Sequence, residues 1–389
     1  MAKYLLAHDI GTSGDKATLF REDGTLIKSI LGEYPSTYGK GGIAEQNPED
    51  WWAAVCRTTK ELLEEIDKKD VAAISFGGMM MGCTPVNDKG EALRSSIMWS
   101  DTRSQKQADE LQAAYGWDAF YETTGHRISP SHTITKLMWI KENQPEIYKK
   151  TYKTLCSKDY IVLKLTGKFV TDYSDASGTL AYNINTKTWA DDVIKSVGLD
   201  VDKFPEIRSG LEVVGTVTAK ASMECGLPEG TPVVLGGGDG QMCAIGAGTS
   251  GDGDVTCNLG TSAFISFYLK EPIHDASKRI VTWNAADPNL VTTCGTMQAL
   301  GASIAWMRDN LCQAEVMRAR AEGVSRYKYI NEASLRSPVG ANGLLFLPYL
   351  QGERSPYWNG AAKGSFVGLT MKHNADDIKR AVFEGVAMN

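Results

Sequence analysis

Residues 1–20 read MAKYLLAHDIGTSGDKATLF and contain two short apolar runs, 4–7 and 17–20, on either side of a polar loop. This pattern predicts two antiparallel strands joined by the loop. Gly11 and Gly14 allow the loop backbone to turn sharply and to come close to a ligand. A further strand over residues 25–31 would extend the hairpin into a meander, so the chain should open on the edge of a sheet.

The loop concentrates groups that bind phosphate. Thr12 and Ser13 supply hydroxyls, the loop amides can converge on an anion, and Lys16 adds a positive charge. Asp9, at the end of a buried strand, supplies a carboxylate that could hold Mg²⁺ directly or through water. The combination indicates a nucleoside triphosphate site. A plain hairpin with a polar turn is the alternative, because a short motif needs its structural context.

A second copy of the pattern provides that context. Residues 254–265 read DVTCNLGTSAFI, in which Gly260, Thr261 and Ser262 again stand between two strand-like runs. Asn258 takes the place that Asp9 has in the first copy. Two similar hairpins so far apart in the sequence predict an internal duplication. The two loops would then bind one triphosphate from both sides, and only the first loop would supply a metal-binding carboxylate. Chance repetition of a Gly-Thr-Ser tripeptide is the simpler explanation, and the strand-like flanks argue against it.

The composition is that of a water-soluble globular protein. The 389 residues are 42% hydrophobic and 23% charged, which is enough for two or three domains with real cores. A net charge of −6 without a basic block argues against a nucleic-acid partner. The eight cysteines show no metal-ligand spacing, and free thiols predict a reducing, cytoplasmic location. No leader or membrane-spanning run is expected, and the oligomeric state stays open, with a homodimer as one alternative.

The rest of the chain alternates predicted strands and helices. Strands are expected over 71–76, 231–235 and 344–350, and helices over 48–68, 104–115, 133–150, 157–166, 216–225, 295–310, 318–332 and 374–389. Residues 170–205 are expected to carry turns. Small and flexible residues over 244–253 predict a domain boundary, which gives a first domain of residues 1–245 and a second of residues 246–389.

Two stretches of the first domain are candidates for binding a small polyol. Met80 and Met81 follow a predicted buried strand and are flanked by glycines, which is where ligands bind in α/β folds, although methionine is usually core filler. Trp99 and Asp101, with Arg103, could offer an apolar platform, a carboxylate and a guanidinium. The duller alternative for Asp101 and Arg103 is an exposed salt bridge.

Asp239 is the candidate catalytic residue. It follows a predicted buried strand and three glycines, Gly236 to Gly238, and it stands at the start of a helix. A carboxylate in such a place suits a general base that accepts a hydroxyl proton as the hydroxyl attacks a phosphoryl group. The alternative is a helix cap without chemistry, although capping and catalysis do not exclude each other.

Taken together, these residues resemble the FGGY carbohydrate kinases, with the xylulokinase-like branch as the most similar. The resemblance runs from Tyr4 to Asn389 and is carried by five segments: 9–16, 131–143, 236–239, 259–262 and 346–354. It implies two ribonuclease-H-like domains of the actin and hexokinase type, with mixed central sheets flanked by helices and a cleft between them. It also implies ATP and Mg²⁺ as cofactors, a small sugar or polyol as the partner molecule, and phosphorylation of one of its hydroxyls, with a pentulose such as xylulose as the expected substrate.

The sequence departs from the family pattern at three places. Met81 stands where xylulokinases commonly have His, and Gly240 stands where they often have Asn; both positions contact sugar in the family, so the departures put D-xylulose itself in question. Family members also continue to an adenosine-binding portion that this sequence lacks, which predicts a fragment or a truncated product. Two other functions remain open: an actin-like or chaperone-type ATPase, and a sugar-binding fragment without catalytic activity.

Overall fold

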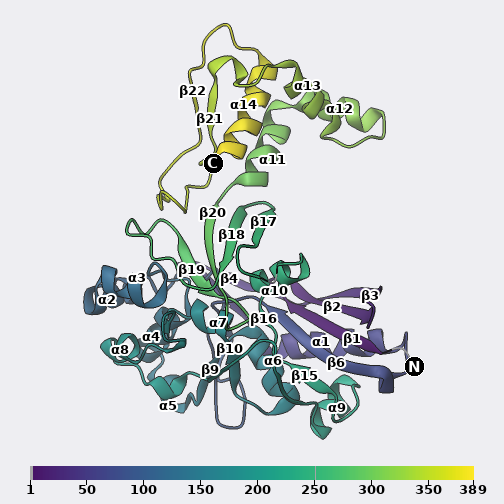
Figure 1. The fold of residues 1–389 in the computed structure, drawn as a ribbon, viewed down its shortest axis with the longest axis vertical. Helices are drawn as coiled ribbons and strands as arrows, with labels where there is room; N and C mark the ends of the chain where they lie inside the picture. Colours follow the sequence, from purple (N-terminus) through teal and green to yellow (C-terminus); the bar gives the residue numbers. More distant parts are fainter. Residues whose placement is uncertain (1–2, 250) are drawn as a thin grey trace. The chain divides into compact units, whose positions relative to one another are not determined.

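The computed structural model describes residues 3–249 and 251–389. The chain forms two compact units (Figure 1). The first comprises residues 1–254 and 268–293, and the second comprises residues 255–267 and 294–389. The chain therefore crosses between the units three times, after residues 254, 267 and 293, before it stays in the second.

A mixed seven-stranded sheet forms the centre of the first unit. Its strand order is β14-β15-β6-β1-β2-β3. The seventh strand, β16, pairs with the end of β6 that follows the part paired with β15. The pairs β1–β6, β6–β15 and β6–β16 are parallel, whereas β1–β2, β2–β3 and β14–β15 are antiparallel. The strands are β1 (Tyr4–Ile10), β2 (Gly14–Arg21), β3 (Leu26–Glu33), β6 (Val71–Gly78), β14 (Val213–Thr216), β15 (Pro232–Val234) and β16 (Gly237–Gly238).

The register of this sheet brings two segments that are far apart in the sequence to one edge. Asp9 of β1 and Gly237 of β16 both pair with Gly77 of β6. Since these three strands are parallel, their carboxyl ends meet at the same edge, and helix α10 (Asp239–Gly246) begins there. Ligands of open α/β sheets bind at such carboxyl ends.

One face of the sheet is covered by helices. Leu6, His8 and Ile10 alternate inward along β1, whereas Asp9 is exposed on the other face. Helix α1 (Pro48–Leu63) begins at the cap Asn47, whose side chain accepts from the amide of Glu49, and packs on β2 and β3. Helices α6 (Ser157–Thr166) and α9 (Ala219–Cys225) lie beside α1 and complete the layer.

The remaining elements of the first unit surround a second core formed by residues such as Ile134, Leu137 and Ile194. The helices are α2 (Gln105–Tyr115), α3 (Trp117–Thr124), α4 (Thr133–Asn143), α5 (Pro145–Lys150), α7 (Tyr173–Gly178) and α8 (Asp191–Ser196). Small sheets accompany them. One has three strands, β4 (Thr37–Gly39), β5 (Ile43–Gln46) and β8 (Ser96–Ile97), and three have two strands: β7 (Thr84–Val86) with β9 (Lys153–Leu155), β10 (Val170–Asp172) with β13 (Glu206–Arg208), and β11 (Tyr182–Asn183) with β12 (Thr188–Trp189).

The second hairpin belongs to a four-stranded sheet of order β17-β18-β20-β19. Its strands are β17 (Val255–Leu259), β18 (Ala263–Leu269), β19 (Val281–Asn284) and β20 (Val291–Met297). The second unit adds α11 (Leu300–Leu311), α12 (Gln313–Ala321), α13 (Lys328–Arg336), β21 (Leu345–Leu347), β22 (Ser365–Val367) and α14 (Ala375–Met388). Helix α14 packs on β21, α11 and α13 around Met307, Phe346 and Val382.

The prediction of a mixed α/β fold with two sheet-bearing parts is confirmed, but several element boundaries were wrong. The helix predicted over 133–150 is two helices, because Pro145 disfavours helical backbone at Gln144. The helix predicted over 318–332 breaks after Ala321, and Gly323 has φ 64°. The stretches 216–225 and 295–310 each begin as a strand, β14 or β20, before their helix starts. Residues 170–205, expected to carry turns, include helices α7 and α8.

All eight cysteines are free thiols. Among the described residues, no helix combines the length and the apolar character that crossing a membrane requires.

Candidate active site

The carbonyl groups of the first loop are tied to the protein. The hydroxyl of Tyr34 donates to the carbonyl of Gly11 at 2.6 Å, and Nε2 of Gln46 donates to the carbonyl of Thr12 at 2.7 Å. Gln46 is held in turn by Nε1 of Trp51 at 2.8 Å. In the part of the chain that the structure describes, no acceptor is assigned to the amides of Thr12 and Ser13. The loop therefore presents donors outward, as an anion site requires.

Trp99 is attached to this loop. Its indole Nε1 donates to Oγ1 of Thr12 at 3.1 Å, and its side chain is half-buried. The structure thus brings one predicted acceptor-binding residue into direct contact with one predicted phosphate-binding residue. A substrate resting on the Trp99 ring would lie beside the loop that is predicted to hold the phosphates.

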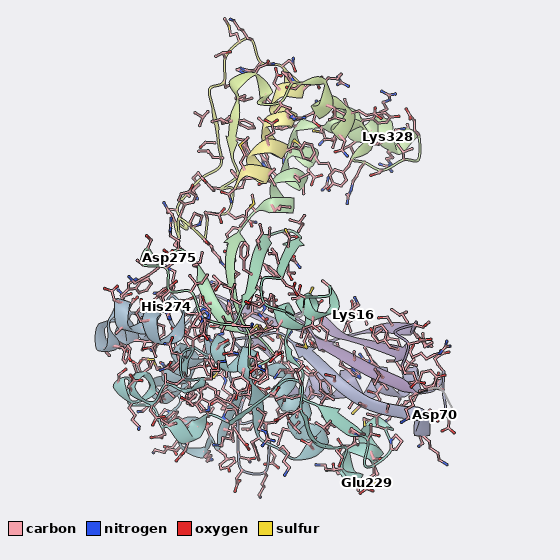
Figure 2. The ribbon with its side chains drawn as sticks, viewed as in Figure 1. Lys16, Asp70, Glu229, His274, Asp275 and Lys328 are labelled. Atoms are coloured by element: carbon pink, nitrogen blue, oxygen red, sulfur yellow. The ribbon has the colours of Figure 1, made fainter. Side chains whose placement is uncertain are left out.

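Asp9 is exposed at the sheet edge, and its carboxylate has no hydrogen-bond donor assigned among the described residues, whereas its carbonyl accepts from the amide of Gly11 at 3.0 Å. Partial burial raises its pKa, the charge of Asp15 adds to that rise, and Lys16 opposes it. Lys16 pairs with Asp9 across β1 and β2 and reaches solvent (Figure 2). A carboxylate without protein donors, close to other carboxylates, fits a hard divalent cation.

Asp239 begins helix α10 directly after β16. Its Oδ1 accepts from the amide of the next residue, Gly240, at 2.7 Å. The helix-cap alternative for Asp239 is wrong, because Gly238 is the N-cap of α10 and no side chain caps this helix. The carboxylate is accessible, yet the surrounding protein displaces much of the water that would stabilise its charge. This desolvation raises the pKa of Asp239 to about 6; the Gly240 amide opposes the rise and the charge of Asp9 adds to it. A Cβ at Gly240 would meet nothing within 4 Å, so the space beside Asp239 is open.

Met80 and Met81 have different surroundings. Met80 is buried and packs against the backbone that leads to Asp239, because a Cβ on Gly238 would lie 2.5 Å from its Cγ and Sδ. Met81 is partly exposed and has φ 64°, a conformation that is rare outside glycine. Its carbonyl accepts from Nζ of Lys136 at 2.8 Å. Burial lowers the pKa of Lys136 to about 7, although nearby Cys83 and Asp101 oppose that shift.

Asp101 is fully buried and its oxygens are engaged. Oδ2 accepts from the amide of Ala44 at 2.6 Å and from Nη2 of Arg103 at 2.6 Å, while Oδ1 accepts from the amide of Arg103 at 3.0 Å. The alternative of an exposed salt bridge is wrong, because the ion pair of Asp101 and Arg103 is buried. Arg103 also forms an ion pair with Glu45 at 2.7 Å. This bonding favours a role in shaping the Trp99 segment, and direct contact of Asp101 with a substrate stays a prediction.

The second loop repeats the arrangement of the first with different partners. The amides of Gly301 and Ala302, in the first turn of α11, donate to the carbonyls of Gly260 and Thr261 at 3.0 and 3.1 Å. The amide of Gly260 bonds to the carbonyl of Ser262 at 2.9 Å, as that of Gly11 does to Gly14 at 3.1 Å. Gly260, Thr261 and Ser262 are all exposed and belong to the second unit.

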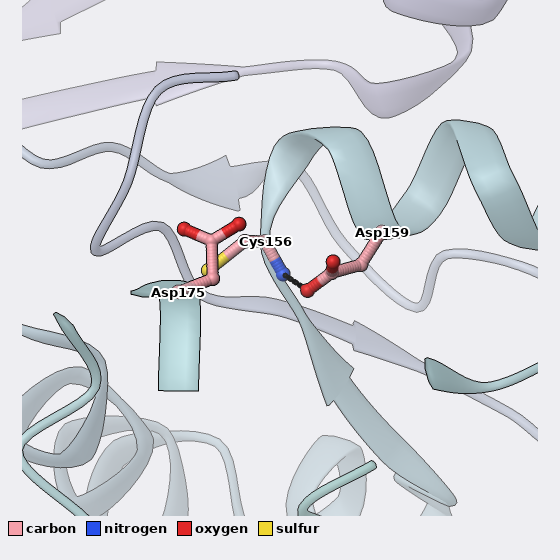
Figure 3. A group of neighbouring side chains, drawn as sticks. All are labelled: Cys156, Asp159 and Asp175. Atoms are coloured by element: carbon pink, nitrogen blue, oxygen red, sulfur yellow. Dashed lines mark hydrogen bonds between the residues drawn. The ribbon is translucent and has the colours of Figure 1, made fainter. Parts of the chain in front are cut away.

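A buried charge cluster lies behind the sheet edge. Nζ of Lys158 is within 3.0 Å of a carboxylate oxygen of Asp159, Asp172 and Asp175, and all four side chains are almost completely buried. Figure 3 shows Cys156 and Asp159 at the start of α6, facing Asp175 on α7. The Cys156, Asp159 and Asp175 ligand atoms lie within 4.8 Å of one another, but the ammonium of Lys158 already supplies the cation that the carboxylates need.

Strand pairing and contacts connect nine of the eleven predicted residues in the first unit: Asp9, Gly11, Thr12, Ser13, Lys16, Met80, Trp99, Asp239 and Gly240. The other two, Met81 and Asp101, are engaged by Lys136 and by Ala44 and Arg103. Sequence reasoning missed the residues that hold them, in particular Tyr34, Gln46 and Ser174. Asp172 was detectable, because an Asp followed by a short polar stretch is typical of a helix N-cap, and its side chain caps α7.

The fold and this edge of the sheet are those of an actin-like sugar-kinase architecture, and comparison with known proteins identifies the family. Residues 4–246 match the N-terminal domain of the FGGY family of carbohydrate kinases, and residues 255–389 match its C-terminal domain. The chain belongs to the FGGY family of carbohydrate kinases.

The individual relatives are named as kinases of two different sugars, xylulose and gluconate. The xylulose kinase of Bacillus subtilis (strain 168) is 33% identical over all of this chain and 76% of its own length. The gluconokinase of the same organism is 31% identical over the same shares. The crystal structure of gluconate kinase from Lactobacillus acidophilus superimposes with a TM-score of 0.91 at 30% identity, covering all of this chain and 77% of that one.

Proposed function

We propose that the protein transfers the terminal phosphoryl group of ATP to a hydroxyl of a sugar or polyol, with Asp239 as the general base. One observation carries the proposal: Asp239 and Asp9 reach the same sheet edge as the loop Gly11–Ser13, whose carbonyls are tied inward. A family of carbohydrate kinases makes ATP the expected donor. It also decides against the chaperone-type ATPase, whereas a sugar-binding fragment without turnover remains the alternative.

The residues of this chain have separate roles in the proposed transfer. Trp99 and the Met80–Met81 segment position the acceptor beside Asp239, whose carboxylate takes the proton of the attacking hydroxyl. The amides and hydroxyls of Thr12 and Ser13 hold phosphate oxygens, and Lys16 adds positive charge. A pKa of about 6 leaves Asp239 ionised at neutral pH and close enough to that pH to act as a base. The grip of Gly260, Thr261 and Ser262 on the same triphosphate stays a prediction.

Asp9 is the residue that would hold Mg²⁺. Its carboxylate is accessible and has no protein donor assigned among the described residues, and its charge raises the pKa of Asp239. A divalent cation, when bound, neutralises phosphate charge and relieves this repulsion.

For the acceptor, we expect a neutral pentulose such as xylulose, with gluconate as the rival. The basic side chains beside the Met80–Met81 segment are already engaged: Lys136 with backbone carbonyls, Arg103 with Asp101 and Glu45, and Lys158 with three aspartates. A carboxylate-bearing acceptor would need a cation that none of these three supplies.

The experiment is an ADP-release assay with ATP, Mg²⁺ and a panel of D-xylulose, D-ribulose, glycerol and D-gluconate. We expect a pentulose to give the highest kcat/KM, and Asp239→Asn to lower kcat by about 10²- to 10⁴-fold while acceptor affinity is kept. Asp252→Asn, an exposed acid in the segment after α10, is the matched control. Near-normal turnover of Asp239→Asn would refute the base, and ADP release that no acceptor changes would refute the kinase.

A further inference from the structure

We propose that Ser174 is a positioning residue for the phosphoryl transfer: its hydroxyl, oriented by Asp172, fixes the backbone from which Asp239 projects. The inference rests on the proposed role of Asp239 and extends it to a residue on helix α7, 65 positions away in the numbering of the chain. Ser174 does not contact Asp239 directly, so its effect would be transmitted through the main chain.

The contact that carries the proposal joins α7 to β16. The amide of Gly238 donates to Oγ of Ser174 at 2.9 Å, in a buried environment. Gly238 is the last residue of β16 and immediately precedes Asp239, the first residue of α10. The direction in which the Asp239 side chain leaves the main chain therefore depends on how the Gly238 peptide is held.

The orientation of the Ser174 hydroxyl is determined by its other neighbour. The hydroxyl has one proton, and that proton is donated to Oδ2 of Asp172, which also accepts from the amide of Ser174 at 2.8 Å. A carboxylate can only accept, so the lone pairs of Oγ remain for the Gly238 amide. A hydroxyl that is free to rotate would lack this preference.

Lys158 keeps Asp172 in its accepting form. Nζ of Lys158 is 2.8 Å from Oδ1 of Asp172, and both side chains are completely buried. Burial works against the lysine charge, but the three aspartates outweigh it and hold the pKa of Lys158 well above its ordinary value. The order of contacts is then Lys158, Asp172, Ser174, Gly238 and Asp239, with each group constraining the next.

Close packing on the other sides leaves Gly238 no alternative position. Met80 occupies the space where a Cβ of Gly238 would lie. At Gly237 a Cβ would lie 3.0 Å from Oγ of Ser174 and 2.9 Å from Cε of Met242. Besides the backbone pairing of β16 with β6, the described residues show one side-chain hydrogen bond to these glycines, the bond from the Gly238 amide to Ser174, and removing it leaves a buried amide without its acceptor.

The test compares Ser174→Ala with Ser177→Ala. Ser177 lies one helical turn further along α7, is equally buried, and accepts from the amide of Asn284 at 3.2 Å. Both variants lose a buried hydroxyl and leave one amide without its acceptor, but only Ser174 faces the turn before Asp239. Hydrogen exchange at the Gly238 amide is measured first, since it does not depend on activity, and the pH profile of kcat/KM is measured second.

For Ser174→Ala we expect faster hydrogen exchange at the Gly238 amide, a kcat lower by about 10- to 100-fold, and an acceptor KM that changes little. We also expect the acid limb of the kcat/KM profile, which is its rise with pH at the low-pH end, to move to lower pH, because Asp239 becomes more accessible to water. Ser174→Thr keeps the hydroxyl and should restore the exchange rate and the acid limb. Ser177→Ala should lower thermal stability without moving either. The inference is overturned if exchange at Gly238 is unchanged in Ser174→Ala, or if Ser177→Ala moves the acid limb as far.

The same set of proteins separates this inference from the proposed function. If Asp239→Asn retains turnover, the general base is assigned wrongly whatever Ser174 does. If Asp239→Asn is inactive and Ser174→Ala has the kcat and acid limb of the original protein, the base stands and the positioning role falls.

Discussion

Asp9 and Asp239 lie on either side of strand β6, since Asp9 pairs with Gly77 and the glycine two positions before Asp239 pairs with the same residue. Neighbouring strands are about 4.8 Å apart, so β1 and β16, one on each side of β6, are about 10 Å apart, and charges at this separation still interact across a partly desolvated edge. The charge of Asp9 accordingly raises the pKa of Asp239. The site therefore combines a metal-binding acid and a base whose properties depend on each other.

The activity should depend on pH through Asp239. A base must be deprotonated, so kcat/KM should rise with pH and reach half its plateau near pH 6, the pKa to which desolvation raises this carboxyl. In Asp9→Asn, the loss of a negative neighbour should move the acid limb to lower pH while the Mg²⁺ concentration needed for activity increases. Initial rates between pH 5 and 8 measure both. An acid limb that is the same in both proteins would contradict the coupling.

Asp239 should also lower the stability of the protein at neutral pH. Its folded-state pKa is raised, so the fold disfavours the charged form, and this cost is absent below the unfolded pKa near 4 and complete above about pH 6. Asp239→Asn should therefore raise Tm more at pH 8 than at pH 5. Thermal melts at the two pH values, with Asp252→Asn as the exposed control, check the sign. A gain that is equal at both values would show that the charge is not the cause.

The loops of the candidate site were easier to predict from the sequence than the buried side chains that hold them in place. The hairpin 1–20 and the strand before Gly236 were predictable, because local patterns of apolar residues and glycines determine them. Ser174 was not, since its role depends on a hydrogen bond to a residue 64 positions later, and no local pattern encodes that contact. The motif of Asp101 predicted a place near the site, but only the structure shows that its oxygens accept from Ala44 and Arg103.

The boundaries that failed have a similar cause. Helical periodicity continued through Gln144, but Pro145 ends α4 and starts α5. In the stretch 295–310, pairing within a sheet overrides helix propensity until Met297, and the helix begins at Leu300. Tertiary pairing is not visible in a window of a dozen residues, so element type was more predictable than element limits.

Tyr34 should affect the nucleotide more than the acceptor. Its hydroxyl donates to the carbonyl of Gly11, and Tyr34→Phe removes that bond from a residue that is 8% exposed. We expect a loss of about 1 kcal/mol in unfolding free energy and a higher KM for ATP, with the acceptor KM unchanged. Tyr152→Phe, at a residue that is 47% exposed and lies in a different part of the first unit, is the matched control. Chemical denaturation and steady-state kinetics measure the two effects, and a KM for ATP that stays constant would remove Tyr34 from the phosphate loop's support.

Gly301 should be indispensable to the second loop for a steric reason. A Cβ at this position would lie 2.5 Å from the carbonyl oxygen of Gly260, which is closer than real Cβ contacts come, and that carbonyl accepts from the Gly301 amide itself. Gly301→Ala must therefore push the loop of Gly260, Thr261 and Ser262 away from α11. If this loop binds phosphate, KM for ATP should rise roughly tenfold, the equivalent of about 1.4 kcal/mol of binding, while acceptor affinity is kept. Gly246→Ala, a helical glycine whose added Cβ meets nothing within 4 Å, controls for the change in helix propensity. Nucleotide and acceptor titrations of both variants decide the matter: an unchanged KM for ATP in Gly301→Ala would leave the first loop alone in holding the triphosphate.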